Sequence, residues 1–208
     1  MVNILGLSGS PRNGGTEYAV LESLREAQAT GGVETTFVTL RGKDIRPCLH
    51  CDHCVRHGSC IHNDDAAGVI DAMFGADGIV IGSPVYDMGI SGQLACLFNR
   101  FRSRDRELCA DPRPFASKVG GAIACGGSRN GGQEMAVNTI LNFCLTQGMI
   151  AVGAGCWENA GGYVFSNDLG KWDQDHDPPG TAGARHVGQR VARLARILEA
   201  NPTGMVLR

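Results

Sequence analysis

The amino-acid sequence predicts an α/β fold in which helices cover both faces of a parallel sheet. Short apolar runs alternate with longer helical patterns along the 208 residues, which is typical of successive βα units. Hydrophobic residues make up 43% of the chain and charged residues 19%, as in a folded protein. This length is enough for one such domain with a real core, and not for two. We therefore expect a single domain over residues 1–208.

Five strands are expected. Val2–Leu7 is a short, mostly apolar run that is typical of a strand. Val33–Leu40 is rich in Val and Thr, which favours a strand near the edge of the sheet. The remaining three are also short apolar runs: Gly78–Ile81, Lys118–Cys125 and Met149–Ala154.

Five helices are expected between and after these strands. Glu17–Ala29 places its apolar residues on one face, and Asp64 can cap a helix that runs to Phe74. The last helix has an apolar stripe at spacings of four, three and four residues, which predicts packing against the core. This last helix is expected over Thr181–Ala200. The remaining two helical patterns cover Gln93–Arg102 and Gly132–Gln147.

Two long segments do not fit the βα count, Arg41–Asn63 and Gly155–Gly180. Irregular segments of this length in a compact protein usually have a function or form an oligomer contact. In doubly wound sheets, ligands bind at the carboxyl ends of the strands, near the switch in strand order. We therefore expect the functional site in the loops after the first, third and fourth strands.

Charge and composition exclude several classes of protein. The chain has 19 basic and 21 acidic residues, a net charge of −2, which disfavours a nucleic-acid binder or a polybasic membrane-surface protein. No apolar stretch reaches the roughly 18 residues that cross a bilayer, and no secretory signal is visible at the start. Nine cysteines is an odd number, so complete disulfide pairing within one chain is impossible. We expect free or metal-bound thiols in a reducing cytoplasm.

The loop after the first strand has the composition of a phosphate site. Residues 8–16 contain hydroxyls, an arginine and glycines, and they lead into a helix N-terminus. Neither a Walker pattern nor G-x-G-x-x-G is present, which disfavours triphosphates and the ordinary dinucleotide fingerprint. A monophosphate such as that of FMN fits better. The alternative is a Ser/Gly turn with a helix cap.

The loops after the third and fourth strands suit a flat ring. Pro84 and Tyr86 at a strand end can form a rigid wall, although a lone tyrosine is more often structural. Four glycines within residues 126–132 let the main chain approach a planar ligand. Arg129 can stabilise an anionic reduced ring or lie in solvent.

Together the motifs at residues 6–12, 82–86 and 129–134 resemble those of the NADPH-dependent FMN reductase branch of the flavodoxin-like fold. The resemblance implies strand order 2-1-3-4-5, with FMN bound non-covalently at the strand ends. It implies that the phosphate region of FMN is held by Ser8, Ser10, Arg12, Asn13, Gly14 and Thr16. It places along the ring Ser83, Pro84, Val85 and Tyr86, and at the other ring edge Arg129, Gly131 and Gly132.

Four cysteines cluster in the segment after the second strand. The spacing is C-x2-C-x2-C-x5-C, within 13 residues, at Cys48, Cys51, Cys54 and Cys60. Four thiolates can bind zinc or a [4Fe–4S] cluster, and the close triplet favours the cluster because zinc sites usually separate two C-x2-C pairs. Zinc stays open as an alternative, and so do unligated thiols. Imidazoles that could replace a thiolate come from His50, His53, His57 and His62.

With this motif the sequence resembles the iron-sulfur flavoproteins. That resemblance implies FMN plus a [4Fe–4S] cluster in each chain, a homotetramer built as a dimer of dimers, and one-electron exchange with a carrier such as ferredoxin. The leading hypothesis is a flavin-dependent electron-transfer oxidoreductase that passes electrons to a small-molecule acceptor. One alternative is an NAD(P)H-dependent FMN or quinone reductase with structural zinc or unligated cysteines. The other is a redox sensor without turnover.

Overall fold

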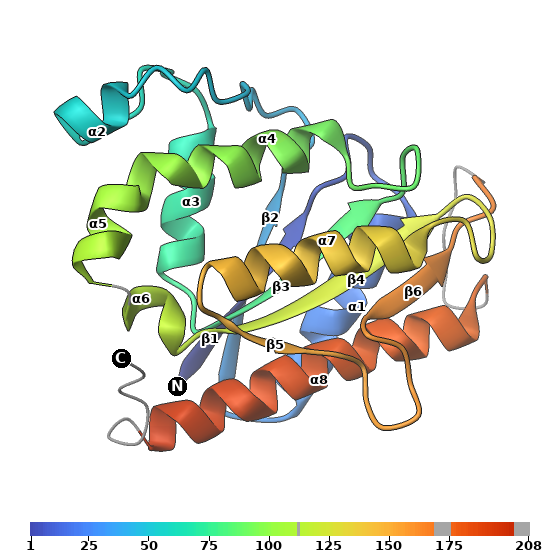
Figure 1. Cartoon of the computed structure of the whole chain (residues 1–208). Helices are drawn as coiled ribbons and strands as arrows, with labels where there is room; N and C mark the ends of the chain where they lie inside the picture. Colours follow the sequence, from blue (N-terminus) through green and yellow to red (C-terminus); the bar gives the residue numbers. More distant parts are fainter. Residues whose placement is uncertain (112, 169–175, 202–208) are drawn as a thin grey trace.

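The structure, a computed structural model, describes residues 1–111, 113–168 and 176–201. A twisted parallel sheet lies at the centre, between α1 and α8 on one face and α3, α4 and α7 on the other (Figure 1). In these ranges no helix is both long enough and apolar enough to cross a membrane.

The sheet has the order β2-β1-β3-β4-β5, and every pair is parallel. This confirms the predicted fold class and strand order, with β2 at the edge. β3 and β4 are buried along their whole lengths because helices cover both of their faces. The strands are β1 (Val2–Ser8), β2 (Val33–Thr39), β3 (Gly78–Pro84), β4 (Val119–Gly126), β5 (Ile150–Val152) and β6 (Gly162–Phe165).

The strand β6 departs from the sequence prediction. β5 pairs with the first part of β4, and β6 pairs with its last part, so two short strands share one position in the sheet. The expected strand over 149–154 is shorter, and the expectation of an irregular 155–180 was wrong for β6. Four residues behind a glycine-rich loop have no detectable period, and their pairing with β4 spans about 40 residues of chain.

The helices mostly follow the predicted ranges. α8 begins three residues earlier than expected because proline is tolerated in the first turn. Asp65 rather than Asp64 is the N-cap of α3, but Asp64 Oδ1 still accepts from Ala66 N at 3.2 Å. The helices are α1 (Gly15–Ala29), α2 (His53–His57), α3 (Ala66–Phe74), α4 (Gly92–Arg100), the 3-10 turn η1 (Phe101–Arg104), α5 (Asp105–Ala110), α6 (Arg113–Ala116), α7 (Gln133–Thr146) and α8 (Pro178–Ala200).

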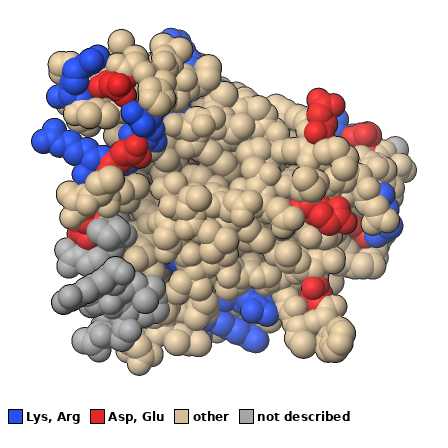
Figure 2. Space-filling model, viewed as in Figure 1, with Lys and Arg blue, Asp and Glu red and all other residues tan. Residues whose placement is uncertain are grey.

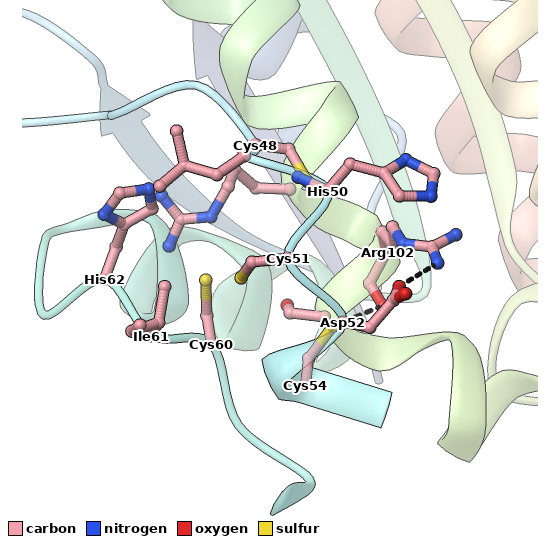
Figure 3. A pocket seen from close by; sticks show the side chains of 12 residues that line it. Cys48, His50, Cys51, Asp52, Cys54, Cys60, Ile61, His62 and Arg102 are labelled. Atoms are coloured by element: carbon pink, nitrogen blue, oxygen red, sulfur yellow. Dashed lines mark hydrogen bonds and ion pairs between the residues drawn. The ribbon is translucent and has the colours of Figure 1, made fainter. Parts of the chain in front are cut away.

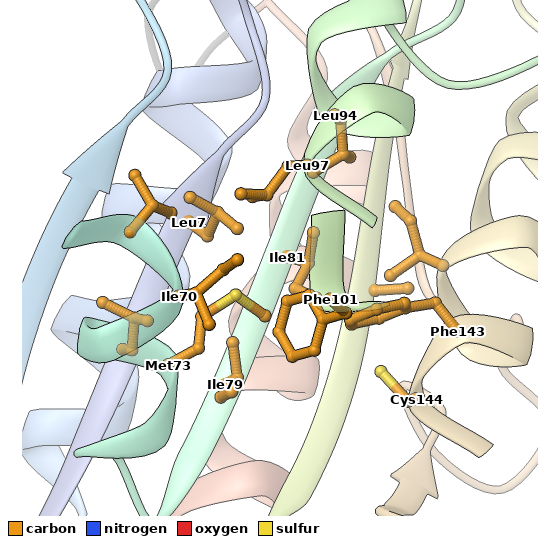
Figure 4. Packing of buried hydrophobic residues seen from close by; sticks show 14 of the residues in the cluster. Leu7, Ile70, Met73, Ile79, Ile81, Leu94, Leu97, Phe101, Phe143 and Cys144 are labelled. Carbon is orange, nitrogen blue, oxygen red and sulfur yellow. The ribbon is translucent and has the colours of Figure 1, made fainter. Parts of the chain in front are cut away.

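Each face of the sheet has its own apolar core. Under α3, α4 and α7, side chains such as Met73, Leu97 and Phe143 converge on Ile79 and Ile81 of β3 (Figure 4). The second core joins the sheet to α1 and α8. The two layers together fix the carboxyl ends of β1, β3 and β4, where the candidate site lies.

Close contact between α1 and α8 yields a stability prediction. A Cβ added at Gly188 would lie 2.0 Å from Ser23 O, so the two helices would have to separate. We expect Gly188→Ala to lower the free energy of unfolding by about 1–3 kcal/mol. Gly183→Ala, in the same helix with its nearest neighbour at 3.9 Å, should instead raise it by up to about 1 kcal/mol. Urea unfolding measures both, and equal effects would contradict the packing argument.

Candidate functional site

A cavity of about 130 Å³ opens at the carboxyl ends of the central strands. It is formed by the loops after β1, β3 and β4 and by the residues after β6. The structure brings together seven of the residues that the sequence placed around FMN: Ser10, Arg12, Gly14, Thr16, Pro84, Val85 and Tyr86.

The N-terminus of α1 lies at one end of this cavity. Gly14, the N-cap, provides no side-chain hydrogen bond to the first turn, so the backbone N–H groups there are available to a ligand. An uncapped helix N-terminus attracts anions through its N–H groups and its dipole. Ser10 Oγ accepts from Arg12 N at 3.2 Å and donates to Arg12 O at 2.7 Å, which fixes the loop that precedes the helix.

Three of the residues predicted to bind FMN do not line the cavity. Ser8 and Ser83 form hydrogen bonds within the loops, and Asn13 lies beside the opening. Ser8 and Ser83 are fully buried. Ser83 Oγ accepts from Ser91 N at 3.0 Å and donates to Pro84 O at 2.8 Å, and Ser8 Oγ accepts weakly from Ser10 N at 3.5 Å. Asn13 is exposed beside the cavity.

The three residues predicted in the loop after β4 lie in different places. Gly132 has φ +99°, and a Cβ there would lie 3.1 Å from Val85 Cγ1, so this glycine lets the two ring-side loops meet. Gly131 N donates to Gln133 Oε1 at 2.7 Å. Arg129 points elsewhere: its Nη2 lies 3.1 Å from Asp177 Oδ1, and it lines a neighbouring cavity of about 230 Å³.

The sequence analysis missed five residues of the cavity wall: Gly15, Cys125, Gly127, Ser166 and Asp168. Ser166 and Asp168 follow β6, so a sequence prediction that included β6 would have placed them at this end of the sheet. Burial raises the pKa of the Cys125 thiol to about 11, so this thiol is uncharged at physiological pH. Asp168 Oδ1 lies 3.3 Å from Arg12 Nη2 across the opening.

A second pocket is lined by all four clustered cysteines, together with His50 and His62 (Figure 3). The segment between β2 and α3 provides these residues, and the end of α4 and η1 closes the opposite side. Cys51 is exposed and the other three thiols are partly exposed. His53 and His57 face each other instead, with ring centroids 4.3 Å apart.

The four thiols surround the pocket without meeting at a point. In the ranges that the structure describes, no three His, Cys, Asp or Glu side chains are close enough to hold one metal ion. A zinc site needs its ligands at about 2.3 Å from a single ion, whereas a cubane offers each thiolate a separate iron.

Hydrogen-bond donors face these thiols. His50 N donates to Cys48 Sγ at 3.4 Å. Arg100 and Arg102 line the pocket, and the Nε of each is buried with no hydrogen-bond partner among the described residues. Buried donors without partners suit a group with sulfur acceptors.

The sequence pattern of the family described as NADPH-dependent FMN reductase matches residues 2–162, which is most of the chain. The chain belongs to this family. Iron-sulfur flavoproteins of Archaeoglobus fulgidus and Methanocaldococcus jannaschii are 39% and 40% identical to it, over 94% of this chain and 97% and 98% of theirs. A flavodoxin, WrbA-like protein from Agrobacterium tumefaciens shares the fold, with a TM-score of 0.66 at 18% identity, over 95% of this chain and 99% of that one.

As a member of the NADPH-dependent FMN reductase family, the protein is a flavin-dependent oxidoreductase. The likeness to iron-sulfur flavoproteins that the motifs predicted is confirmed. The roles of the individual site residues stay predictions, which the geometry above makes specific.

Proposed function

We propose that this flavoprotein moves electrons between a one-electron carrier such as ferredoxin and a small-molecule acceptor, using FMN and a [4Fe–4S] cluster. When bound, the cluster exchanges single electrons and the flavin one or two. The observation that supports this most is that all four thiols of C-x2-C-x2-C-x5-C line one pocket with unsatisfied donors. The cavity beside α1 supports the flavin half of the proposal.

In the flavin cavity, the chain would bind the phosphate at the N-terminus of α1 and against Ser10 and Arg12. Pro84 to Tyr86 would orient the ring, and Gly132 would let main chain approach it from the other side. The buried, neutral Cys125 would give that wall an uncharged surface.

In the cysteine pocket, Cys48, Cys51, Cys54 and Cys60 would be the cluster ligands. Cys51 is exposed, so an external carrier could approach closely. Between and beside the ligands, Leu49, Val55 and Ile61 are 50–62% exposed and offer apolar contact to a partner.

The assembly and the compartment are part of the same proposal. We propose one FMN-binding domain over residues 1–208, with 41–63 as its cluster-binding segment. Acidic and basic side chains gather near α2 and α5, whereas a broad face around α7 has few charges (Figure 2). Met135 and Leu145 of α7 are more than half exposed, which supports a homo-oligomer, dimer or tetramer. All nine cysteines are free thiols, which supports a reducing cytoplasm.

Metal and flavin analysis tests the proposal directly. Protein purified without oxygen is expected to contain about four irons and four sulfides per chain, together with bindable FMN. Stoichiometric zinc without iron would overturn the cluster. Failure to bind any flavin would overturn the flavin site.

The phosphate site is tested by Gly14→Asp. The new carboxylate would cap α1 and repel a phosphate there, and the nearest atom to an added Cβ is 3.8 Å away, so the side chain fits. We expect FMN affinity to fall about 100-fold, equivalent to about 3 kcal/mol. Fluorescence titration of the flavin-free protein measures this.

Riboflavin is the control ligand, because it has the same ring without the phosphate. Its affinity should change little in Gly14→Asp. Equal weakening of FMN and riboflavin would mean that the substitution disturbs the ring site, and would contradict a phosphate at α1.

A second candidate is direct reduction by NAD(P)H, with the cysteine segment binding zinc. The description of the matching family, which names NADPH, is the observation that favours it. Rapid anaerobic bleaching of bound flavin by NADPH, in protein that contains zinc and no iron, would support this candidate over electron transfer through a cluster.

A further inference from the structure

We infer that Arg100 and Arg102 are positioning residues for the cluster, whose Nε–H groups donate to its sulfur ligands and raise its reduction potential. The inference rests on the proposed function, since it requires the cluster in the cysteine pocket. It adds two residues outside the cysteine motif, which come from the end of α4 and from η1.

Arg100 uses its terminal nitrogens on protein partners. Nη1 donates to Asp64 Oδ2 at 2.6 Å and to Arg46 O at 2.9 Å, and Nη2 donates to Asp64 Oδ1 at 3.0 Å. The side chain is 2% exposed. Its Nε is buried and has no hydrogen-bond partner within the described part of the chain, and the residue lines the cysteine pocket.

Arg102 repeats the arrangement two residues later. Its Nη2 donates to Asp52 Oδ1 at 2.6 Å, as the dashed line in Figure 3 shows, while its Nε is buried and unsatisfied among the residues described. The backbone oxygen of Arg102 also lies 3.6 Å from Cys54 Sγ. In both arginines a carboxylate holds a terminal nitrogen of the guanidinium, and both residues line the pocket that the four thiols also line.

The four thiols line the same pocket as the two arginines. Although burial alone would lower it, the hydrogen bond to Asp64 raises the pKa of Arg100, and Cys60 adds to this effect. The hydrogen bond to Asp52 is the main cause that raises the pKa of Arg102, and Cys54 makes a small further contribution. A buried N–H without a partner costs about 1–3 kcal/mol, and a thiolate or sulfide acceptor would remove that cost.

The effect on the potential follows from charge. When the carrier loses one electron and the cluster gains it, the cluster becomes more negative by one unit. Arginine stays protonated throughout, so no proton moves. Donors and fixed positive charge stabilise the reduced form more than the oxidised form, and therefore raise the potential.

The test uses Arg102 because its side chain is 33% exposed and its replacement is expected to leave the fold intact. Arg102→Lys keeps a charge but has no Nε–H, and Arg102→Met removes both. Arg104→Met is the matched control: Arg104 also lies in η1, is 30% exposed, and pairs with Asp71 and Glu107 away from the thiols. Each variant is assayed anaerobically for iron, sulfide and FMN, and its cluster potential is measured by redox titration with EPR detection.

We expect Arg102→Met to favour the oxidised cluster about tenfold at a given potential, which is about 59 mV for one electron. Arg102→Lys should shift in the same direction by less, and Arg104→Met should match the wild type. Unchanged potentials in both Arg102 variants, with iron retained, would overturn this inference but not the proposed cluster. A wild-type protein without iron would overturn the proposed cluster, and the inference with it.

Discussion

The Cys51→Ser variant is expected to lose nearly all of its iron and sulfide while it keeps FMN. Serine is a poor ligand for iron in a cubane, and the three remaining thiols of the pocket leave one corner without a thiolate. The flavin cavity is formed by other loops and has no cysteine of the cluster segment in its wall. The measurement is iron, sulfide and flavin content after anaerobic purification, with the visible absorption spectrum.

Cys156→Ser is the matched control, since Cys156 is also an exposed free cysteine and lies outside the cysteine pocket. It should retain iron at the wild-type level. Electron transfer from reduced ferredoxin to the flavin should be lost only in the Cys51 variant. If both variants keep the same iron content, Cys51 is not a ligand.

The Arg100→Met variant is expected to lose about 3–5 kcal/mol of stability at neutral pH. The side chains of Arg100 and Asp64 are 2% and 0% exposed, and removing the guanidinium leaves a buried carboxylate without its counter-charge. For a protein of this size, each kcal/mol lowers the melting temperature by about 2–4 °C. Urea unfolding of metal-free protein measures the change without a contribution from cluster loss.

The stabilisation by this pair should depend on pH in a defined direction. Although burial alone would raise it, hydrogen bonds from Arg100 and from backbone N–H groups lower the pKa of Asp64 from 3.8 to about 2. The contribution is therefore complete above pH 3.8 and is lost as pH falls through about 2. The difference between wild type and Arg100→Met should shrink towards pH 2.

Two further variants separate charge from packing. Arg104→Met removes a partly exposed arginine of η1 and should change stability by less than about 0.5 kcal/mol. Asp64→Asn in the Arg100→Met background removes the unpaired charge and should restore part of the loss. A double variant less stable than Arg100→Met would show that the buried charge is not the cause.

The cavity at the carboxyl ends of the central strands was largely predictable because its residues follow strands. Strands such as Val2–Leu7 can be recognised from the hydrophobicity of neighbouring residues alone. Because parallel strands bring their carboxyl ends to one edge of the sheet, the loops that follow them meet there. Ser10, Thr16 and Tyr86 therefore met as expected. Arg129 did not join them, because its partner Asp177 is 48 residues away and no local pattern reveals that contact.

Positions that depend on distant partners were not predictable. β6 forms because four residues pair with the distant strand β4. This pairing places Ser166 and Asp168, which follow β6, in the cavity wall. Arg100 reads in the sequence as an ordinary charge at the end of a helix. Its burial depends on Asp64, 36 residues earlier in the chain.

By itself the sequence determined the alternation of strands and helices, the glycine-rich loop that leads into the first helix, and the spacing of four cysteines. These are properties of neighbouring residues, and periodicity and spacing express them directly. Only the tertiary structure decided which arginine faces which carboxylate, and that two Nε–H groups in the cysteine pocket have no partner among the residues described. The physical reason is that a buried charge or donor is defined by the groups that surround it, and here those groups come from segments far apart in the chain.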